Sequence, residues 1–291
     1  MYHLILAILC SVAVSVLLKI ARKKNIVIDQ AIAFNYITAI TFSYFLLKPD
    51  FKGLAFIDYI AQSESILIFL ALGILLPTVF LIMSKAVEFA GIVRSDAAQR
   101  LSLFLPILAA FLIFHETLSR SKVLGITFAF IGLFCLLSKP NQDKSVINFK
   151  GILGLVGVWF GYGIIDILFK QMAKSGGAFP ATLFISFSIA ACLMFIYLLL
   201  KRTQWTVPSV FGGIMLGVLN FFNILFYIKA HQSFGGNPTL VFAGMNIGVI
   251  CLGTITGALI FKEKISKLNW LGIMFSLAAI FSLYYLDKII V

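Results

Sequence analysis

Apolar runs of membrane-spanning length follow one another along almost the whole chain. A helix needs about 20 predominantly apolar residues to cross roughly 30 Å of hydrocarbon, and only helices or closed barrels satisfy their backbone hydrogen bonds there. The runs are unbroken, so they lack the alternating pattern of a barrel strand. The sequence therefore predicts an all-α polytopic membrane protein with ten transmembrane helices, at 2–20, 30–47, 66–84, 91–114, 123–138, 151–169, 178–200, 207–228, 238–261 and 268–286.

The composition leaves little material for a soluble domain. Of the 291 residues, 61% are hydrophobic and 12% are charged, and the mean hydropathy is +1.06. The Lys and Arg behind the net charge of +12 lie mostly in short connections, where they anchor spans at lipid headgroups. The four cysteines lie within apolar runs and form no CxxC pair. We therefore expect a multi-pass protein of a cell membrane, the bacterial inner membrane, with no nucleic-acid partner, cofactor or metal.

The most specific signal is an internal repeat. Residues 114–126 recur as residues 261–273, an offset of 147, with six of thirteen positions identical. The chain then divides into two five-helix halves, 1–146 and 147–291. Because five is odd, the second half begins on the opposite side of the membrane, which predicts two inverted repeats. In transporters built this way the substrate site lies near the membrane midplane between the halves.

A ten-helix chain whose fourth and ninth spans each run into a short glutamate-containing turn, followed by Leu-Gly and another apolar helix, resembles the EamA-type branch of the drug/metabolite transporter (DMT) superfamily. The resemblance covers the whole chain and implies a transporter, usually an exporter, of metabolites such as amino acids. Two features depart from the branch: the first span lacks its usual tryptophan, and the fourth span carries several charges. The matching residues are Lys19, Pro106, Glu116, Gly125, Lys170, Glu263 and Gly272.

The fourth span carries charges that are costly in a membrane. Arg100 lies about ten residues into the span, or roughly 13 to 15 Å deep, and a charge there costs about 2.5 to 3.5 kcal/mol. Asp96, Gln99 and Arg100 share one helix face, whereas Arg94 points away and can snorkel to the interface. One interpretation is a structural ion pair between Asp96 and Arg100. The other is a substrate site in which Arg100 binds a carboxylate or phosphate through its planar fork.

Further polar residues recur at helical spacing in the second half. Trp159, Tyr162 and Asp166 share one face, Asn220 and Asn223 share another, and Asn246 aligns with Gln99 by the 147-residue offset. They could line a pocket with directional donors and stacking surfaces, or simply join helices through hydrogen bonds. Asp166 is a candidate for coupling to a proton, with a solvated role as the alternative. The predicted substrate-binding residues are Asp96, Gln99, Arg100, Trp159, Tyr162, Asn220, Asn223 and Asn246.

Three smaller patterns concern the backbone. Glu116 and Glu263 lie in turns before a helix that Ser119 and Ser266 are placed to cap, so we interpret both turns as structural. Pro77 and Pro106 are expected to interrupt the third and fourth spans. Three GxxxG pairs predict close helix approach, at Gly157 and Gly161, Gly213 and Gly217, and Gly253 and Gly257.

These patterns favour a carrier over an enzyme or a channel. The three histidines are scattered, and no glycine-rich phosphate loop is present. We expect a secondary transporter, not an enzyme, that exports a small organic metabolite, amino-acid-like or otherwise anionic, by alternating access. The alternative is a polytopic membrane enzyme that acts on a lipid-type substrate. The expected partners are a small-molecule substrate, the lipid bilayer and a coupling proton or ion, for a monomer or a homodimer.

Overall fold

The computed structural model describes residues 1–23, 26–54, 56–63, 65–137, 148–262 and 265–286. Within these ranges the chain consists of helices and connections, without a strand. Ten helical spans among them are long and apolar enough to cross a membrane. The predicted class is therefore confirmed, and each predicted span agrees with one of these to within six residues at each end.

The first five spans are α1 (Tyr2–Lys23), α2 (Ile28–Phe42, continued by a π-helical turn at Ser43–Leu47), α4 (Ile66–Ala90), the pair α5 (Ile92–Leu101) and α6 (Phe104–Leu112), and α7 (Arg120–Leu137). The other five are α8 (Phe149–Lys174), α9 (Phe179–Leu200), α10 (Val207–Ser233), α11 (Pro238–Phe261) and α12 (Lys267–Phe281, continued by a π-helical turn at Ser282–Leu286). A short helix, α3 (Phe56–Gln62), lies in the connection between α2 and α4.

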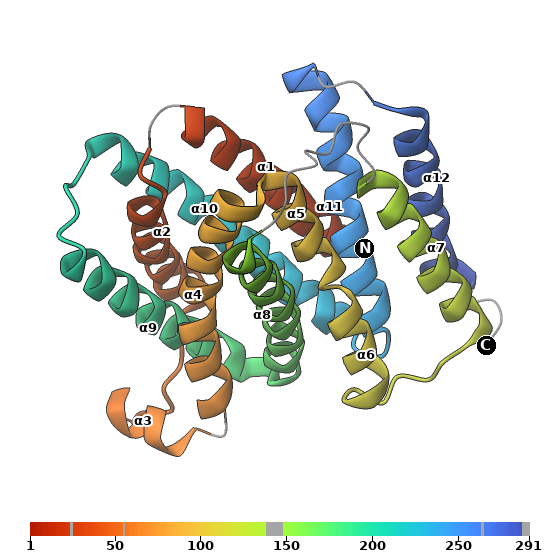
Figure 1. Ribbon diagram of the computed structural model, residues 1–291. Helices are drawn as coiled ribbons and strands as arrows, with labels where there is room; N and C mark the ends of the chain where they lie inside the picture. The colour runs from red at the N-terminus through yellow and green to blue at the C-terminus, as the bar shows by residue number, and fades with distance from the viewer. Residues whose placement is uncertain (24–25, 55, 64, 138–147, 263–264, 287–291) are drawn as a thin grey trace.

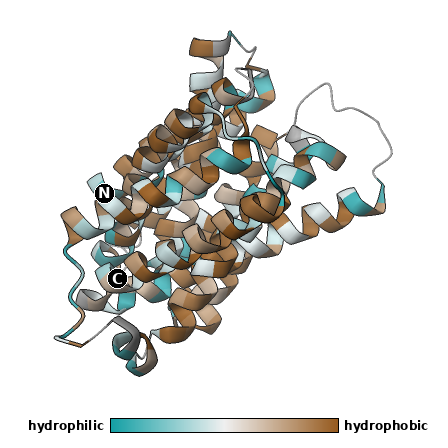
Figure 2. Ribbon diagram, turned by 90° about the vertical axis from the view of Figure 1, so that its left-hand side faces the viewer, coloured by the Kyte–Doolittle hydropathy of each residue, from teal (hydrophilic) through white to brown (hydrophobic). Residues whose placement is uncertain are grey.

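Apolar side chains cover the outer face of the spans. Leu67, Leu200 and Leu259 are among the large hydrophobic residues that remain exposed along these helices. Figure 2 shows hydrophobic residues over most of the helical surface and hydrophilic residues mainly at helix ends and connections. Such a surface suits lipid, where a helix satisfies its own backbone hydrogen bonds.

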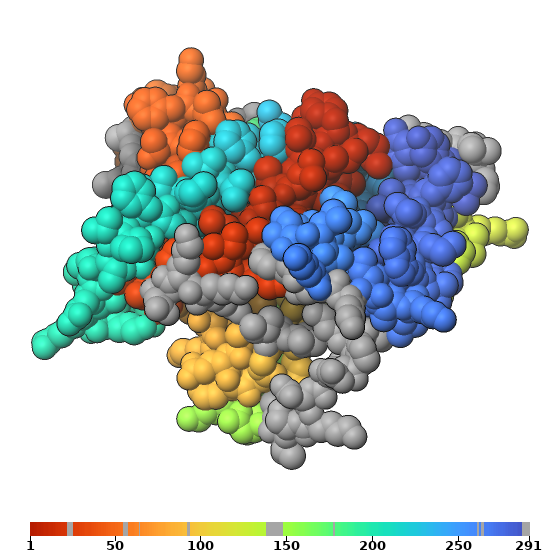
Figure 3. Space-filling model, turned by 90° about the horizontal axis from the view of Figure 1, so that it is seen from above, coloured from red at the N-terminus to blue at the C-terminus, as the bar shows by residue number. Residues whose placement is uncertain are grey.

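Helices of the first half are interleaved with helices of the second. Helix α1 packs against α10 and α11, and α4 packs against α8 and α9 (Figure 1). Seen from above, α1 lies between α11 on one side and α9 and α10 on the other (Figure 3). The main buried cluster accordingly takes large side chains from both halves, among them Tyr36, Phe187, Phe221 and Phe242.

Two of the three GxxxG pairs bring helices close together, as expected. Gly157 and Gly161 lie against α4, where an added Cβ atom would approach Ile82 to 3.0 Å at Gly157 and would clash with Val79 at Gly161. Gly213 meets backbone: a Cβ there would lie 2.6 Å from the carbonyl oxygen of α2 residue Ala31. The third pair differs, because a Cβ at Gly253 would find no atom within 4 Å.

Helices α7 and α12 lie side by side and run in opposite directions (Figure 1). The bare face of Gly125 on α7 lies against Leu283, in the turn that continues α12, and the bare face of Gly272 on α12 lies against Leu136 on α7. Gly125 and Gly272 are 147 residues apart, and so are Leu136 and Leu283. The same glycine-to-leucine contact therefore occurs twice in this pair.

The fourth span is broken between α5 and α6, at Ser102 and Leu103. Pro106 has no N–H, and its ring needs the space next to the carbonyl group of Ser102, four residues earlier. The chain tightens at the break: Leu103 N donates to Arg100 O at 3.2 Å, and Leu105 N donates to Ser102 O at 3.0 Å. The expected interruption at Pro106 is confirmed.

Helix α4 passes through Pro77 without interruption, so the expected break in the third span is wrong. A proline removes one backbone hydrogen bond, and packing on neighbouring helices can hold the helix together despite that loss. Helix α4 lies between α8 and α9, which supply such packing.

The two predicted serine caps are confirmed. Ser119 Oγ accepts from Lys122 N at 3.2 Å at the start of α7. Ser266 Oγ accepts from Asn269 N at 3.1 Å, and the Asn269 side chain accepts in return from Ser266 N. Glu263, in the second turn, lies outside the described residues.

Candidate functional site

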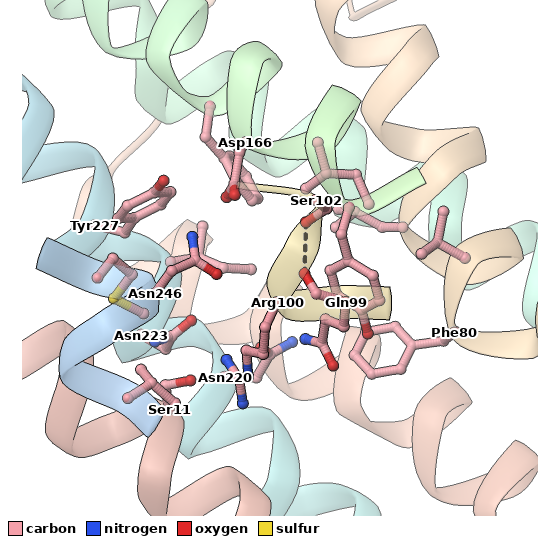
Figure 4. Close-up of a pocket in the computed structure, with 18 residues that line it drawn as sticks. Ser11, Phe80, Gln99, Arg100, Ser102, Asp166, Asn220, Asn223, Tyr227 and Asn246 are labelled. Carbon is pink, nitrogen blue, oxygen red and sulfur yellow. Dashed lines mark hydrogen bonds between the residues drawn. The ribbon is translucent and has the colours of Figure 1, made fainter. Parts of the chain in front are cut away.

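A cavity of about 130 Å³ lies among helices from both halves, between α1, α4 and α5 on one side and α8, α10 and α11 on the other. Its wall is partly apolar, with residues such as Val79, Phe80 and Phe169. Polar side chains from five helices converge on it (Figure 4), namely Ser11, Gln99, Arg100, Ser102, Tyr162, Asp166, Asn220, Asn223, Tyr227 and Asn246.

Arg100 brings a positive charge to this cavity. Its Nε lies 3.5 Å from Asp96 Oδ1, and the Arg100 side chain is 12% exposed whereas that of Asp96 is 46% exposed. Asp96 is not among the lining residues, so the ion pair lies at the edge of the site. Within the described part of the chain, no hydrogen bond to the guanidinium is found. The terminal nitrogens of Arg100 are therefore available for a ligand.

Asp166 brings a carboxyl group to the same cavity. Its carboxyl group lies beside the Tyr227 hydroxyl and the Asn246 side chain, away from Asn220 and Ser11 at the other end (Figure 4). The Tyr227 hydroxyl is buried and has no hydrogen-bond partner among the described residues. The cavity thus has a guanidinium group and a carboxyl group, with polar side chains between them.

Three asparagines line the cavity and also join helices. Asn220 Nδ2 donates to Asn35 Oδ1 on α2 at 3.1 Å, and Asn223 Nδ2 donates to Ala7 O on α1 at 2.8 Å. Asn246 Nδ2 donates to Phe242 O within α11 at 3.2 Å. Each amide nitrogen uses one of its two N–H groups in these bonds, which leaves the other N–H and the amide oxygen as groups that a ligand could use. Asn220 and Asn223 therefore line the cavity and also join helices, so the two interpretations of these residues are compatible.

Trp159 lies behind the cavity rather than in its lining. Its indole N–H donates to Leu101 O at 3.0 Å, and its ring packs on Phe160 with centroids 4.6 Å apart. Ser102 Oγ similarly donates to Gln99 O at 2.6 Å. These two groups donate to carbonyl oxygens at the break between α5 and α6. Trp159 and Ser102 therefore stabilise the end of α5, which carries Arg100.

The cavity brings together seven of the predicted residues: Gln99, Arg100, Tyr162, Asp166, Asn220, Asn223 and Asn246. It leaves out Asp96 and Trp159, and their part in binding stays a prediction. Sequence reasoning missed Tyr227, although it follows Asn220 and Asn223 at helical spacing on α10. It also missed Ser11, which has Ser15 one turn later on the same face of α1.

No group of three His, Cys, Asp or Glu side chains able to hold a metal ion occurs in the residues that the structure describes.

Comparisons with known proteins agree with the helical architecture. No family model matches the chain. A protein of known crystal structure aligns over 99% of this chain and 97% of its own, with a TM-score of 0.71 and 14% sequence identity, so the two share a fold. An uncharacterized protein of Haemophilus influenzae is 86% identical over 290 residues and is covered over its full length. At this identity, the chain belongs to the same family as the Haemophilus influenzae protein.

Proposed function

We propose that this protein is a secondary transporter of the inner membrane that moves a small organic solute by alternating access and resembles the EamA-type branch. The solute carries an acid group and an amino group, and export is the expected direction. The observation that carries the proposal is the cavity between the two halves, with Arg100 and Asp166 in a setting of amides and hydroxyls. A cavity that is covered toward one side of the membrane needs a conformational change to exchange its contents with that side.

Alternating access requires two halves that can move against each other, which we propose are the inverted repeats 1–146 and 147–291. The antiparallel pair α7 and α12 supports this division, since Gly125 meets Leu283 and Gly272 meets Leu136. A two-fold axis between the helices would exchange these two contacts. Because the helices run across the membrane in opposite directions, such an axis would lie in the membrane plane.

The lining determines which solute fits. Arg100 can bind a carboxylate through its planar fork, and Asp166 can accept hydrogen bonds from a protonated amino group. Amide oxygens of the asparagines can accept the remaining amino protons. The volume of about 130 Å³ favours a small solute, because pockets for drug-sized ligands are several times larger.

Binding a zwitterion would also lower the cost of moving the site. Each charge in a low-dielectric interior is expensive unless it is paired. A bound carboxylate would pair with Arg100 and a bound amino group with Asp166, so the loaded site would have no unpaired charge. We therefore expect the loaded form to change conformation more readily than the empty form.

Exchange in proteoliposomes tests the proposal with three matched solutes: a small α-amino acid, its deaminated acid and its decarboxylated amine. We expect saturable exchange of the amino acid and far weaker exchange of the other two. Asp166→Asn should lose preference for the amino acid over the deaminated acid. If Asp166 instead carries a coupling proton, the variant should keep this preference and lose proton-driven accumulation. Exchange of no member above protein-free liposomes would refute the proposal.

A further inference from the structure

We propose that Glu116, Lys122 and Thr239 form a latch that closes the cavity toward one side of the membrane and must open for the solute to pass there. This side, the N-terminal side, is the one at which α1, α4, α9 and α11 begin. Glu116 lies in the connection between α6 and α7, in the first half, whereas Thr239 is the second residue of α11, in the second half. The inference rests on the proposed alternating access.

The contacts of Glu116 cross between the halves. Its Oε2 accepts from Thr239 N at 3.0 Å and from Thr239 Oγ1 at 2.6 Å. Its Oε1 lies 3.1 Å from Lys122 Nζ, which also donates to Thr117 O at 3.0 Å. The Glu116 side chain is fully buried and that of Lys122 is 5% exposed. A buried carboxylate with these partners is a strong contact, and it lies at the positive end of the α11 helix dipole.

Glu116 does more than complete the end of α11. The helix already has its own cap, because Asn237 Oδ1 accepts from Leu240 N at 3.1 Å. That cap leaves the Thr239 N–H for Glu116, so the first half supplies a charged acceptor to the start of a helix in the second half. The chain also holds His115, the residue before Glu116, at φ of +53°, which is uncommon for a residue other than glycine. This turn is therefore built to present Glu116 to the second half.

An aromatic layer lies between the latch and the cavity. Phe242 follows Thr239 by one turn of α11, and its ring centroid is 4.7 Å from that of His231 on α10. His231 in turn lies 4.7 Å from the ring of Tyr227, which lines the cavity. Phe242 and His231 are fully buried. A shift of the start of α11 would move Phe242 and disturb this layer, so the latch and the layer should open together.

The other side of the cavity is less enclosed. Asp96 lies one turn from Arg100 toward the opposite membrane face, and its side chain is 46% exposed. The fourth span is therefore less covered close to the site from that direction, while the latch and the aromatic layer cover the N-terminal side. The structure thus has the arrangement of a carrier that is closed on its N-terminal side.

Access of a thiol reagent to the cavity measures the latch without any solute. Val249 lines the cavity, and Val249→Cys would be placed in a chain whose native cysteines are replaced by alanine. A membrane-impermeant maleimide is then applied to each face in right-side-out and inside-out vesicles. Labelling of Tyr2→Cys, at an exposed residue next to the N-terminus, identifies the N-terminal side. The native cysteines are Cys10, Cys135, Cys192 and Cys251.

We expect slow labelling of Val249→Cys from the N-terminal side in the parent chain. Glu116→Gln should speed it at least about tenfold, because a buried charge-assisted contact is lost. Thr239→Val keeps the shape and the backbone N–H but removes one hydrogen bond, so about three- to fivefold is expected. The matched control is Asp29→Asn, which removes a 2.7 Å ion pair with Lys201 on the opposite side of the membrane. It should leave labelling from the N-terminal side unchanged.

Two results would overturn the latch. One is unchanged labelling in Glu116→Gln and Thr239→Val when a thermal unfolding measurement shows that both proteins are folded. If Glu116→Gln does not fold, the labelling of Thr239→Val decides. The other is an equal increase in Asp29→Asn, which would indicate general loosening. The proposed function is separate: faster labelling without exchange of any solute would refute transport and keep the latch, and exchange with unchanged labelling would refute the latch alone.

Discussion

Arg100 and Asp96 show how two charges on one helix can have different surroundings. Sequence spacing pairs them, and the structure places the two side chains 3.5 Å apart at Nε and Oδ1. Of the two, Arg100 lines the cavity, whereas Asp96 lies one turn nearer the end of the span and is more exposed. An ion pair at the Nε edge leaves the two terminal nitrogens of the guanidinium for a ligand. The structural and functional interpretations of this pair are therefore compatible.

Arg100 variants should separate charge from geometry. Arg100→Lys keeps the positive charge but loses the planar fork, so exchange of a carboxylate solute should fall about tenfold or more. Arg100→Gln removes the charge and should nearly abolish exchange. Both are measured as initial rates in proteoliposomes, with protein abundance and thermal stability compared in the same preparation.

A double variant controls for the partner that Arg100 leaves behind. Removing Arg100 alone strands Asp96, whereas Asp96→Asn/Arg100→Gln neutralises both members of the pair. We expect this variant to be about as stable as the parent and inactive. If it exchanges the solute with the parent's affinity, the two charges are structural and Arg100 does not bind the substrate.

Helical spacing predicted which polar residues share a face, but not which face meets a cavity. Asn220 and Asn223 were found this way, and Tyr227 follows them on the same face of α10. Trp159 satisfies the same spacing with Tyr162 and Asp166, yet it turns to Leu101 because the broken span offers it a carbonyl oxygen. That oxygen lacks its usual helical donor because Leu105 N donates to Ser102 O at the break, and spacing on α8 cannot reveal which group of another helix needs a donor.

At the scale of the helix, the break in the fourth span depends on a side chain from another helix. Trp159→Phe removes the indole donor and leaves Leu101 O without it, which should lower the free energy of unfolding by about 1 to 3 kcal/mol. Trp205→Phe is the matched control, since Trp205 is 47% exposed and should change stability by less than about 0.5 kcal/mol. Thermal unfolding in detergent compares the two. Equal midpoints would show that the indole contact does not support the break.

The glycines of α10 and α11 give a second comparison between helices. A Cβ at Gly213 would lie 2.6 Å from the carbonyl oxygen of Ala31, so Gly213→Ala should force α2 and α10 apart and cost about 1 to 3 kcal/mol. Gly253→Ala meets nothing within 4 Å and should be neutral or stabilising by up to about 1 kcal/mol, because alanine favours helix. The thermal unfolding midpoint should therefore fall for Gly213→Ala, and it should stay the same or rise for Gly253→Ala.

The two prolines show where element-scale prediction stops. Both remove a backbone hydrogen bond, but only Pro106 breaks its span. At Pro106, Ser102 and Trp159 supply donors to the carbonyl groups around the break. The outcome depends on what neighbouring side chains can offer, and a local sequence pattern does not include those neighbours.

At the scale of the whole molecule, the ten spans were predictable because lipid leaves few choices for the backbone. Long apolar runs must form helices there, so run length alone located each span. The arrangement of the helices was less accessible. Contacts such as Asn223 with Ala7 join residues of the two halves that are far apart in the chain, and their partners follow from shape rather than from composition.

We call the contact of Gly125 with Leu283 and of Gly272 with Leu136 the seam between α7 and α12. This seam should help to hold the two halves together when they are separate polypeptides. If 1–146 and 147–291 are produced as two polypeptides, we expect them to copurify from membranes. Gly272→Phe should reduce copurification, because the bulky ring cannot fit against Leu136, whereas Gly253→Phe has open space around it. Recovery of each half alone in every case would contradict this.

The seam would allow a chain of this kind to arise from two copies of one five-helix polypeptide. Gly125 on α7 and Gly272 on α12 each receive a leucine from the other helix, so the seam is self-complementary. Two copies of one five-helix polypeptide, inserted in opposite orientations, could meet through identical contacts without a second gene. Fusion of the two copies would then fix one copy in each orientation and free each half to vary, so that one keeps Arg100 and the other Asp166.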